Sequence, residues 1–211
     1  MPRLEFFRKL GLFVVSDFMD AAYCADLRSE MRETAFEKGT VARTGDESAV
    51  DESIRRVSCA KDPKPTKLIV RSRLEQLKPE LEKHFQVQLT GYDGPHFLVY
   101  GPQAFYRPHQ DASPGSPPEI LYRQVSVVIF LNAAAQEPAE GAYGGGSLAF
   151  YGLLQGANWA KCPFPLEASP GLLVAFRPSV LHEVKPVTFG QRFTIVAWYT
   201  NQSNSALPMI A

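Results

Sequence analysis

The sequence predicts a mainly β protein, folded as a double-stranded β-helix (jelly roll), with α-helices from its N-terminal part packed against one side. Two observations support this prediction. Between residues 97 and 199, short runs rich in β-branched and aromatic residues alternate with turns that contain glycine or proline. Earlier in the chain, two stretches instead place apolar residues at the helical period.

The first predicted elements are a short strand at residues 12–15 and a helix at residues 22–36. Asp20 is a suitable N-cap, because its side chain can accept a hydrogen bond from the first turn of the helix. Leu27, Met31 and Ala35 follow at helical spacing and give this helix a core-facing side.

A second helix is predicted at residues 65–85. Its apolar stripe consists of Val70, Leu74, Leu77, Leu81 and Phe85. Pro79 should kink or restart this helix, since proline lacks a backbone N–H and clashes with the preceding turn. Between the two helices, residues 38–65 are polar, glycine-containing and mixed in charge, which is the pattern of a loop.

The predicted strands of the C-terminal part are short and rich in valine, isoleucine and phenylalanine. They occupy residues 124–132, 144–150, 170–176, 182–187 and 190–199. We expect a single domain at residues 1–211, in which residues 1–95 supply supporting helices and a loop and residues 96–200 form the jelly-roll core. Residues 202–211 are predicted to form a tail.

Composition excludes several classes of protein. The formal net charge is zero and the pI is about 6.9, so nothing predicts attraction to nucleic acid or to an anionic membrane surface. Cys24, Cys59 and Cys162 are odd in number and lack metal-ligand spacing, which argues against a disulfide framework. With no signal-peptide pattern and no long apolar run, we expect a cytoplasmic protein.

The most informative residues are His109, Asp111 and His182. In an extended segment, residues two apart point the same way, so His109 and Asp111 can reach one ion while Gln110 points away. His182 lies 71 residues after Asp111 and would have to arrive from a distant strand. Two imidazoles and one carboxylate form the ligand set of non-haem Fe(II) oxygenases, which leave metal positions open for dioxygen and an organic co-substrate.

The order of motifs around these residues resembles the prolyl 4-hydroxylase-like branch of the Fe(II)/2-oxoglutarate-dependent oxygenases. The matching motifs cover residues 97–199, about half of the chain. They are His-x-Asp at 109–111, a strand ending in Leu-Asn at 131–132, Gly-Gly-x-Leu at 145–148, Pro-Gly at 170–171, His-Glu-Val-Lys-Pro-Val at 182–187, and Arg192.

The resemblance implies that His109, Asp111 and His182 are the catalytic metal ligands for Fe(II). It implies that Arg192 binds the far carboxylate of 2-oxoglutarate, a role that suits a guanidinium because it forms two parallel hydrogen bonds with a carboxylate. Tyr100 occupies the position of a co-substrate contact, although a buried core aromatic fits it as well. The further reactant is dioxygen, with ascorbate as a reductant.

Other positions bear on co-substrate and substrate binding. Trp198 has even spacing from Arg192, so it could line the inner pocket or serve only in packing. Phe130 stands where some relatives carry a tyrosine, so a hydroxyl contact to the co-substrate is either absent or supplied elsewhere. Ser147 stands where relatives often have a glutamate, and no catalytic role is assigned to it.

Substrate contacts are expected from an aromatic and cationic rim. The candidates are Arg56 in the 38–65 loop, which in the resembling enzymes can fold over the barrel mouth, together with Tyr106, Arg107 and Arg123. Tyr122 and the loops at 112–119 and 133–146 lie nearby in sequence and can add specificity. Plain surface positions are the alternative for each of them.

Three functions fit the sequence. The first is 2-oxoglutarate-dependent hydroxylation of a prolyl or other residue in a protein or peptide. The second is the same chemistry on a free amino acid or other small metabolite. The third is a metal-binding jelly roll that acts as a sensor or binding module, for which Arg192 would have no evident purpose.

Overall fold

A computed structural model describes all of the chain except residues 1, 42–48, 62–65, 155, 157–158 and 203–211. The predicted tail at 202–211 therefore lies almost wholly outside the described residues. The helices and strands are α1 (Pro2–Lys9), β1 (Phe13–Val15), α2 (Ala21–Glu33), β2 (Phe36–Lys38), β3 (Arg55–Arg56), β4 (Ser58–Ala60), α3 (Thr66–Phe85), β5 (Gly91–Tyr100), β6 (Phe105–His109), α4 (Pro118–Leu121), β7 (Arg123–Phe130), β8 (Tyr143–Gly145), β9 (Leu148–Phe150), β10 (Phe164–Leu166), β11 (Leu173–Phe176), β12 (His182–Val184), β13 (Val187–Gly190) and β14 (Arg192–Thr200).

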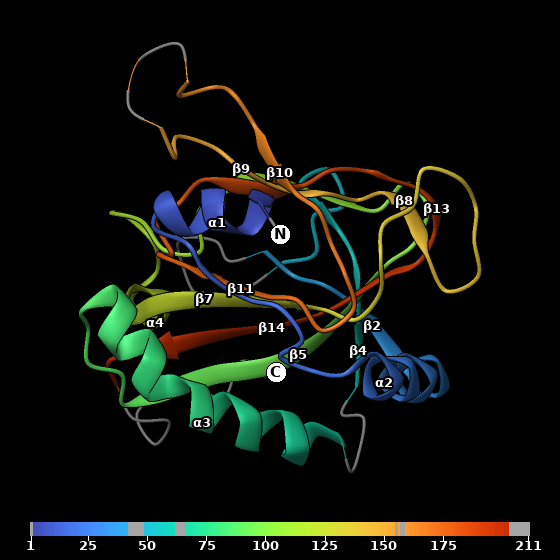
Figure 1. The fold of residues 1–211 in the computed structure, drawn as a ribbon, viewed down its shortest axis with the longest axis horizontal. Coiled ribbons are helices and arrows are strands. Elements are labelled where there is room, and N and C mark those ends of the chain that lie inside the picture. The colour runs from blue at the N-terminus through green and yellow to red at the C-terminus, as the bar shows by residue number, and fades with distance from the viewer. Residues whose placement is uncertain (1, 42–48, 62–65, 155, 157–158, 203–211) are drawn as a thin grey trace.

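Two antiparallel sheets face each other, as the jelly-roll prediction requires. The larger sheet has seven strands in the order β1-β11-β7-β14-β5-β4-β2, and the smaller has five in the order β10-β9-β12-β6-β3. Strands β13 and β8 form a separate pair. Figure 1 shows α2 and α3 on one face of the larger sheet, with α1, β9 and β10 on the opposite side.

The sequence predicted the positions of the two covering helices, but α2 ends at Glu33, and Ala35, which was expected on its core-facing side, is exposed and lies outside the helix. Asp20 caps α2, because its Oδ1 accepts a hydrogen bond from the Tyr23 amide at 2.7 Å. The five residues of the predicted α3 stripe are all buried and belong to one hydrophobic cluster, together with residues of α2 and of the larger sheet. However, α3 continues through Pro79 as one helix of 20 residues, so the predicted restart there is wrong.

The prediction of a loop at residues 38–65 was wrong for its second half. Strand β4 pairs with β5 and β2, and β3 pairs with β6, so this segment belongs to both sheets. Its strand sequences, Arg-Arg and Ser-Cys-Ala, lack the apolar alternation of a half-buried strand. Pairing with distant strands, rather than local propensity, determines their conformation.

The core has two layers, one on each side of the larger sheet. In β7, Val125, Val127 and Ile129 pack against α2 and α3, whereas Val128 and Phe130 face the smaller sheet. Both faces of β7 are buried from Val125 onwards, which explains why its second half, residues 127–130, is continuously apolar. The space between the two sheets is where an enclosed site can form.

The Pro-Gly turn before β11 requires its glycine. Gly171 has a φ of +77°, and a Cβ atom there would lie 1.8 Å from the Met19 carbonyl oxygen. Its carbonyl accepts a hydrogen bond from Phe18 N, and its amide donates to Phe130 O. The turn therefore connects the segment before α2 to the end of β7.

Among the described helices, none combines the length and apolarity needed to cross a membrane.

Candidate active site

Three side chains predicted as metal ligands converge between the two sheets. His109 ends β6, Asp111 follows it, and His182 begins the neighbouring strand β12. One Asp111 oxygen lies 3.6 Å from His109 Nε2 and the other lies 3.7 Å from His182 Nε2. One ligand atom from each residue can be chosen so that all three lie within 4.8 Å of one another, close enough to share one ion.

Backbone hydrogen bonds orient both imidazoles. His109 Nδ1 lies 2.8 Å from the Arg107 carbonyl oxygen, and His182 Nδ1 lies 2.9 Å from the Val180 carbonyl oxygen. A carbonyl oxygen can only accept, so each Nδ1 carries a hydrogen, and Nε2 is the ring nitrogen that faces Asp111. Such contacts fix the tautomer and ring orientation of metal-binding histidines.

The protonation states also suit a metal. Burial, with the neighbouring His109 adding to it, lowers the pKa of His182 to about 4, so this ring is neutral at pH 7. Burial by itself raises the pKa of Asp111, but the two histidines and Arg123 outweigh it and the pKa lies well below its usual range. The donor set at neutral pH therefore includes a neutral imidazole and a carboxylate, as metal coordination demands.

A β-bulge brings a tyrosine next to the metal ligands. His182 pairs with His109 and Val184 pairs with Tyr106, so β6 carries one residue more than β12 between these two pairs. In a regular strand, two residues three apart, as Tyr106 and His109 are, would point to opposite faces of the sheet. Instead their rings stack, with centroids 3.4 Å apart and planes at 17°.

Arg192 is fully enclosed at the other side of the same cavity. Its exposed fraction is 2%, and its guanidinium carbon lies 5.0 Å from the Tyr100 ring and 5.2 Å from the Phe130 ring. Its Nη1 donates a hydrogen bond to Thr194 Oγ1 at 3.3 Å, and its Nε is buried without a partner in the described structure. A buried guanidinium with unused donors needs an anionic ligand.

One cavity joins these groups. It is lined by the three candidate metal ligands, Tyr100, Tyr106 and Arg192, and by further residues of β14. Thr194, Val196 and Trp198 alternate along that strand and face inwards with Arg192. Arg192 has unused donors and lies in the same cavity as the three candidate metal ligands. This arrangement fits a dicarboxylate co-substrate that binds the ion at one end and Arg192 at the other.

Comparison with known proteins identifies the family. A family profile described as the 2OG-Fe(II) oxygenase superfamily matches residues 95–200, half of the chain. The chain belongs to the 2OG-Fe(II) oxygenases. Members of this family are 2-oxoglutarate-dependent dioxygenases that use Fe(II), and the donor set described above fits that metal.

Solved prolyl hydroxylases share the fold of this oxygenase. A Pseudomonas putida prolyl-4-hydroxylase is 24% identical, with a TM-score of 0.64 over 92% of this chain and 94% of that chain. A Trichoplax adhaerens prolyl hydroxylase, in complex with a hypoxia inducible factor oxygen degradation domain peptide fragment, is 19% identical, with a TM-score of 0.71 over 92% of this chain and 85% of that chain. A viral collagen prolyl hydroxylase from Paramecium Bursaria Chlorella virus-1, in a 2OG complex, is 14% identical, with a TM-score of 0.59 over 91% and 96%. No curated protein matches the chain.

The rim residues expected from the sequence lie at different places in the oxygenase. Tyr106 lines the cavity, but Arg56 and Arg107 are exposed and do not. In the pairing of β3 with β6, Arg55 lies opposite Tyr106 and Arg56 lies opposite Phe105. Since opposite residues share a face, Arg55 points into the cavity and Arg56 points away from it.

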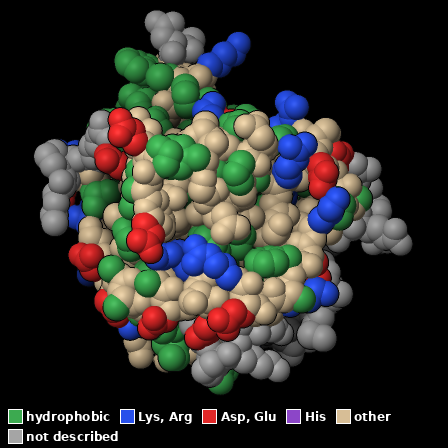
Figure 2. Space-filling model, turned by 90° about the vertical axis from the view of Figure 1, so that its right-hand side faces the viewer, with side chains coloured by type: hydrophobic (Ala, Val, Ile, Leu, Met, Phe, Trp, Pro, Cys, Tyr) green, Lys and Arg blue, Asp and Glu red, His purple; other side chains and the backbone are tan. Residues whose placement is uncertain are grey.

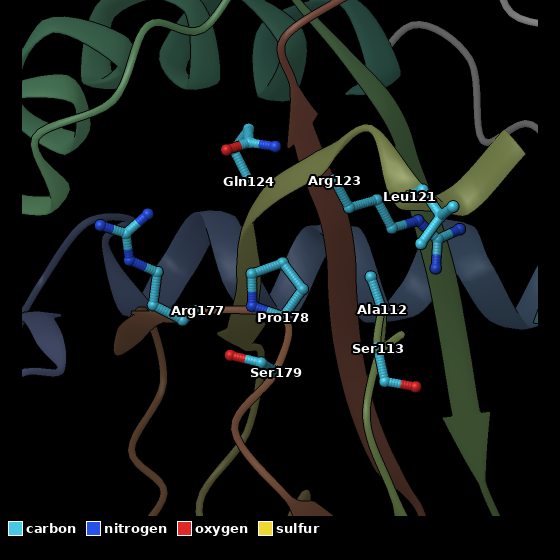
Figure 3. Close-up of a pocket in the computed structure, with 8 residues that line it drawn as sticks. All are labelled: Ala112, Ser113, Leu121, Arg123, Gln124, Arg177, Pro178 and Ser179. Atoms are coloured by element: carbon cyan, nitrogen blue, oxygen red, sulfur yellow. The ribbon is translucent and has the colours of Figure 1, made fainter. Parts of the chain in front are cut away.

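Arg123 separates the cavity from a second hollow. Its guanidinium carbon lies 3.8 Å from the centroid of the Trp198 ring, which lines the cavity, and it forms an ion pair with Asp93 at 3.1 Å. Its other surroundings include Gln124, Ser179 and Arg177, which line the hollow. Figure 3 shows Arg177 and Arg123 on opposite sides of this hollow, with Pro178 between them.

The surface of the oxygenase has mixed charge on the face seen in Figure 2. Basic and acidic side chains are interspersed there, with hydrophobic side chains between them, and no large area of one sign is visible. This distribution agrees with the formal net charge of zero. A long polyanion has no continuous basic surface to bind on this face.

Sequence reasoning missed two residues of the site. Arg55 lines the cavity. The strand that carries it was not predicted, so the sequence could not show which of the two adjacent arginines faces inwards. Tyr143 is fully buried, and its hydroxyl has no hydrogen-bond partner in the described structure. The available signal for Tyr143 was its place directly before the glycine run that leads to Leu148.

Proposed function

We propose that this oxygenase hydroxylates a C–H bond of a residue in a protein or peptide, as a prolyl 4-hydroxylase-like enzyme. One observation carries the proposal: a buried triad of His109, Asp111 and His182 shares a cavity with the buried, unpaired Arg192. The complex of a similar fold with a peptide fragment supports a peptide substrate. Family membership favours an enzyme over a metal-binding module without oxygenase activity.

In this proposal, His109, Asp111 and His182 hold Fe(II) through Nε2, a carboxylate oxygen and Nε2. Iron bound there would let dioxygen oxidise 2-oxoglutarate to succinate and carbon dioxide and the substrate C–H bond to C–OH, with one oxygen atom of dioxygen entering each product. The residues of the chain position these reactants and exclude water, as is general for cofactor-dependent enzymes.

We assign Arg192 to the far carboxylate of 2-oxoglutarate, with Tyr100 beside it. Cross-strand pairing places Tyr100 directly opposite Arg192. The Tyr143 hydroxyl is the candidate to replace the hydroxyl that Phe130 lacks. Burial raises the pKa of Tyr143, and Arg192 opposes this rise, so the two side chains are near each other. Trp198, Tyr106 and Arg123 lie at the substrate side of the metal.

The same chemistry on a free amino acid or small metabolite is the second candidate. The specific observation in its favour is the half-buried cation Arg55, which faces the cavity with no carboxylate partner among the described residues. A small acid would supply that partner. The two candidates share every step at the metal and differ only in the substrate.

The test is turnover of 2-oxoglutarate by the purified protein with Fe(II), ascorbate and dioxygen. Succinate release should rise when a true substrate is added, and the product should carry one extra oxygen atom by mass spectrometry. Proline-containing peptides and free amino acids form the two arms of the screen, and His182→Ala is the inactive control. Tight iron binding with no succinate from any substrate would refute the enzyme assignment.

A further inference from the structure

Arg55 occupies a defined position beside the metal ligands. It lies directly opposite Tyr106 in the β3–β6 pair, and its guanidinium carbon is 4.9 Å from the centroid of the Tyr106 ring. Tyr106 in turn stacks on His109. The guanidinium, the phenol and the imidazole therefore form a layered arrangement that ends at a proposed metal ligand.

The backbone behind Arg55 holds the guanidinium from one side. Arg55 Nη1 donates a hydrogen bond to the Thr40 carbonyl oxygen at 2.6 Å. A Cβ atom added at Gly39 would lie 3.4 Å from both Cζ and Nε of Arg55, so the chain at residues 39–40 approaches the guanidinium closely. The hydrogen bond to Thr40 uses Nη1, so Nε, which lies beside Gly39, and Nη2 form the remaining edge of the guanidinium.

That remaining edge has no anionic partner. Among the described residues, Arg55 forms no ion pair, and its Nε is buried without a hydrogen-bond acceptor. Arg123, the other nearby arginine, is by contrast paired with Asp93 at 3.1 Å. The carboxylate oxygens of Asp111, the acidic residue that lines the cavity, are directed at the two histidines.

The charges of a loaded site leave Arg55 unbalanced. The two positive charges of Fe(II) and the single charge of Arg192 are cancelled by Asp111 and by the two carboxylates of 2-oxoglutarate. Arg55 then remains as one uncompensated cation in a largely enclosed space, which is unfavourable unless an anion binds it. The Nε–Nη2 edge of a guanidinium matches the two oxygens of a carboxylate.

We propose that Arg55 binds a carboxylate group of the substrate, so that this oxygenase selects substrates carrying a carboxylate near the C–H bond that reacts. The proposal rests on the proposed function and specifies its substrate class. The carboxylate can belong to a free amino acid, to the C-terminus of a peptide or to an acidic side chain in a peptide. In each case Arg55 holds the anion while Tyr106 packs beside the metal ligands.

The test compares matched pairs of compounds that differ only in this charge. The pairs are free L-amino acids and their amides, proline-containing peptides and their C-terminal amides, and peptides with an internal Glu or Gln. Succinate release from the Fe(II)- and 2-oxoglutarate-loaded protein is the readout. The carboxylate member should be preferred in kcat/KM by about 10- to 150-fold, which corresponds to about 1.5–3 kcal/mol for hydrogen bonds to a charged group.

Arg55→Gln should reduce this preference to less than about threefold, mainly through KM, because the amide cannot supply the charge. Arg56→Gln is the matched control, since Arg56 is exposed, lies on the opposite face of β3 and does not line the cavity. Whichever pair shows the preference identifies the source of the carboxylate. Equal turnover of charged and amidated members, or equal loss of preference in both variants, would overturn the proposal.

If no compound in the panel is turned over, that result counts against the proposed function. A thermal measurement then tests the proposed role of Arg55 separately. An unpaired binding cation adds little to stability, so Arg55→Met should melt within about 3 °C of wild type without substrate. A much larger fall in melting temperature would show that Arg55 is a structural residue. That result would also overturn the proposal.

Discussion

Arg192 gives the most direct test of the co-substrate site, through the variant Arg192→Met. Methionine has a similar length and fills the space between the Tyr100 and Phe130 rings, but it has neither charge nor donors. Removing one partner of a buried ion pair costs about 2–5 kcal/mol of binding free energy. The dissociation constant for 2-oxoglutarate should therefore rise at least about 30-fold.

The protein without co-substrate should respond in the opposite direction. Arg192 is 2% exposed and has no carboxylate partner among the described residues, so replacing a buried unpaired charge by an apolar side chain should be neutral or stabilising. At a 2-oxoglutarate concentration of about 100 times Kd, ligand binding stabilises wild type by about 2.7 kcal/mol. For a chain of this size, that amounts to a rise in melting temperature of about 5–11 °C.

The assay is therefore a pair of thermal melts of the Fe(II)-loaded protein without dioxygen, with and without 2-oxoglutarate, supported by calorimetric titration. Wild type should show the full shift, whereas Arg192→Met at the same 2-oxoglutarate concentration should shift by no more than about 3 °C. Arg32→Met is the matched control, because Arg32 lies 4.9 Å from the Phe193 ring on the helix side of β14 and is exposed. A full shift in Arg192→Met, or an equal loss of iron affinity, would refute the assignment.

The other predictions concern the metal and one turn. His182→Ala leaves two of the three candidate ligands, so iron affinity should fall at least about tenfold. Elemental analysis after gel filtration should then show less than one iron per chain. Retention of one iron per chain would place the metal elsewhere. Gly171→Ala should lower the free energy of unfolding by more than about 2 kcal/mol in urea, because its Cβ would lie 1.8 Å from Met19 O. Gly115→Ala, at φ +93° with no atom within 4 Å, should cost only about 1–2 kcal/mol, and equal midpoints for both variants would contradict the clash.

The parts of the fold that sequence predicted are those where local pattern and tertiary packing agree. The second half of strand β7, residues 127–130, is continuously apolar because both of its faces are buried, and the α3 stripe is buried along its whole length. Strands β3 and β4 escaped prediction because two or three residues carry no periodicity, and only their partners β5, β6 and β2 define them.

The same limit applies to the candidate site. His109, Asp111, His182 and Arg192 were identifiable because their spacing has a chemical reason. The choice between Arg55 and Arg56 was not, since it depends on which of two adjacent residues lies opposite Tyr106. The orientation of Tyr106 also depends on an extra residue in β6, and the regular alternation of side chains along a strand does not predict that residue. Bulges and strand register are properties of the assembled sheet.

The site draws its two anchoring functions from different layers of the protein. The triad belongs to the five-stranded sheet through β6 and β12, whereas Arg192 belongs to β14 in the seven-stranded sheet. A molecule coordinated to the metal and paired with Arg192 at once therefore ties the two sheets together across the interior. In the proposed site, the co-substrate would therefore be a removable cross-link between the two sheets, present when it binds and lost when it is consumed.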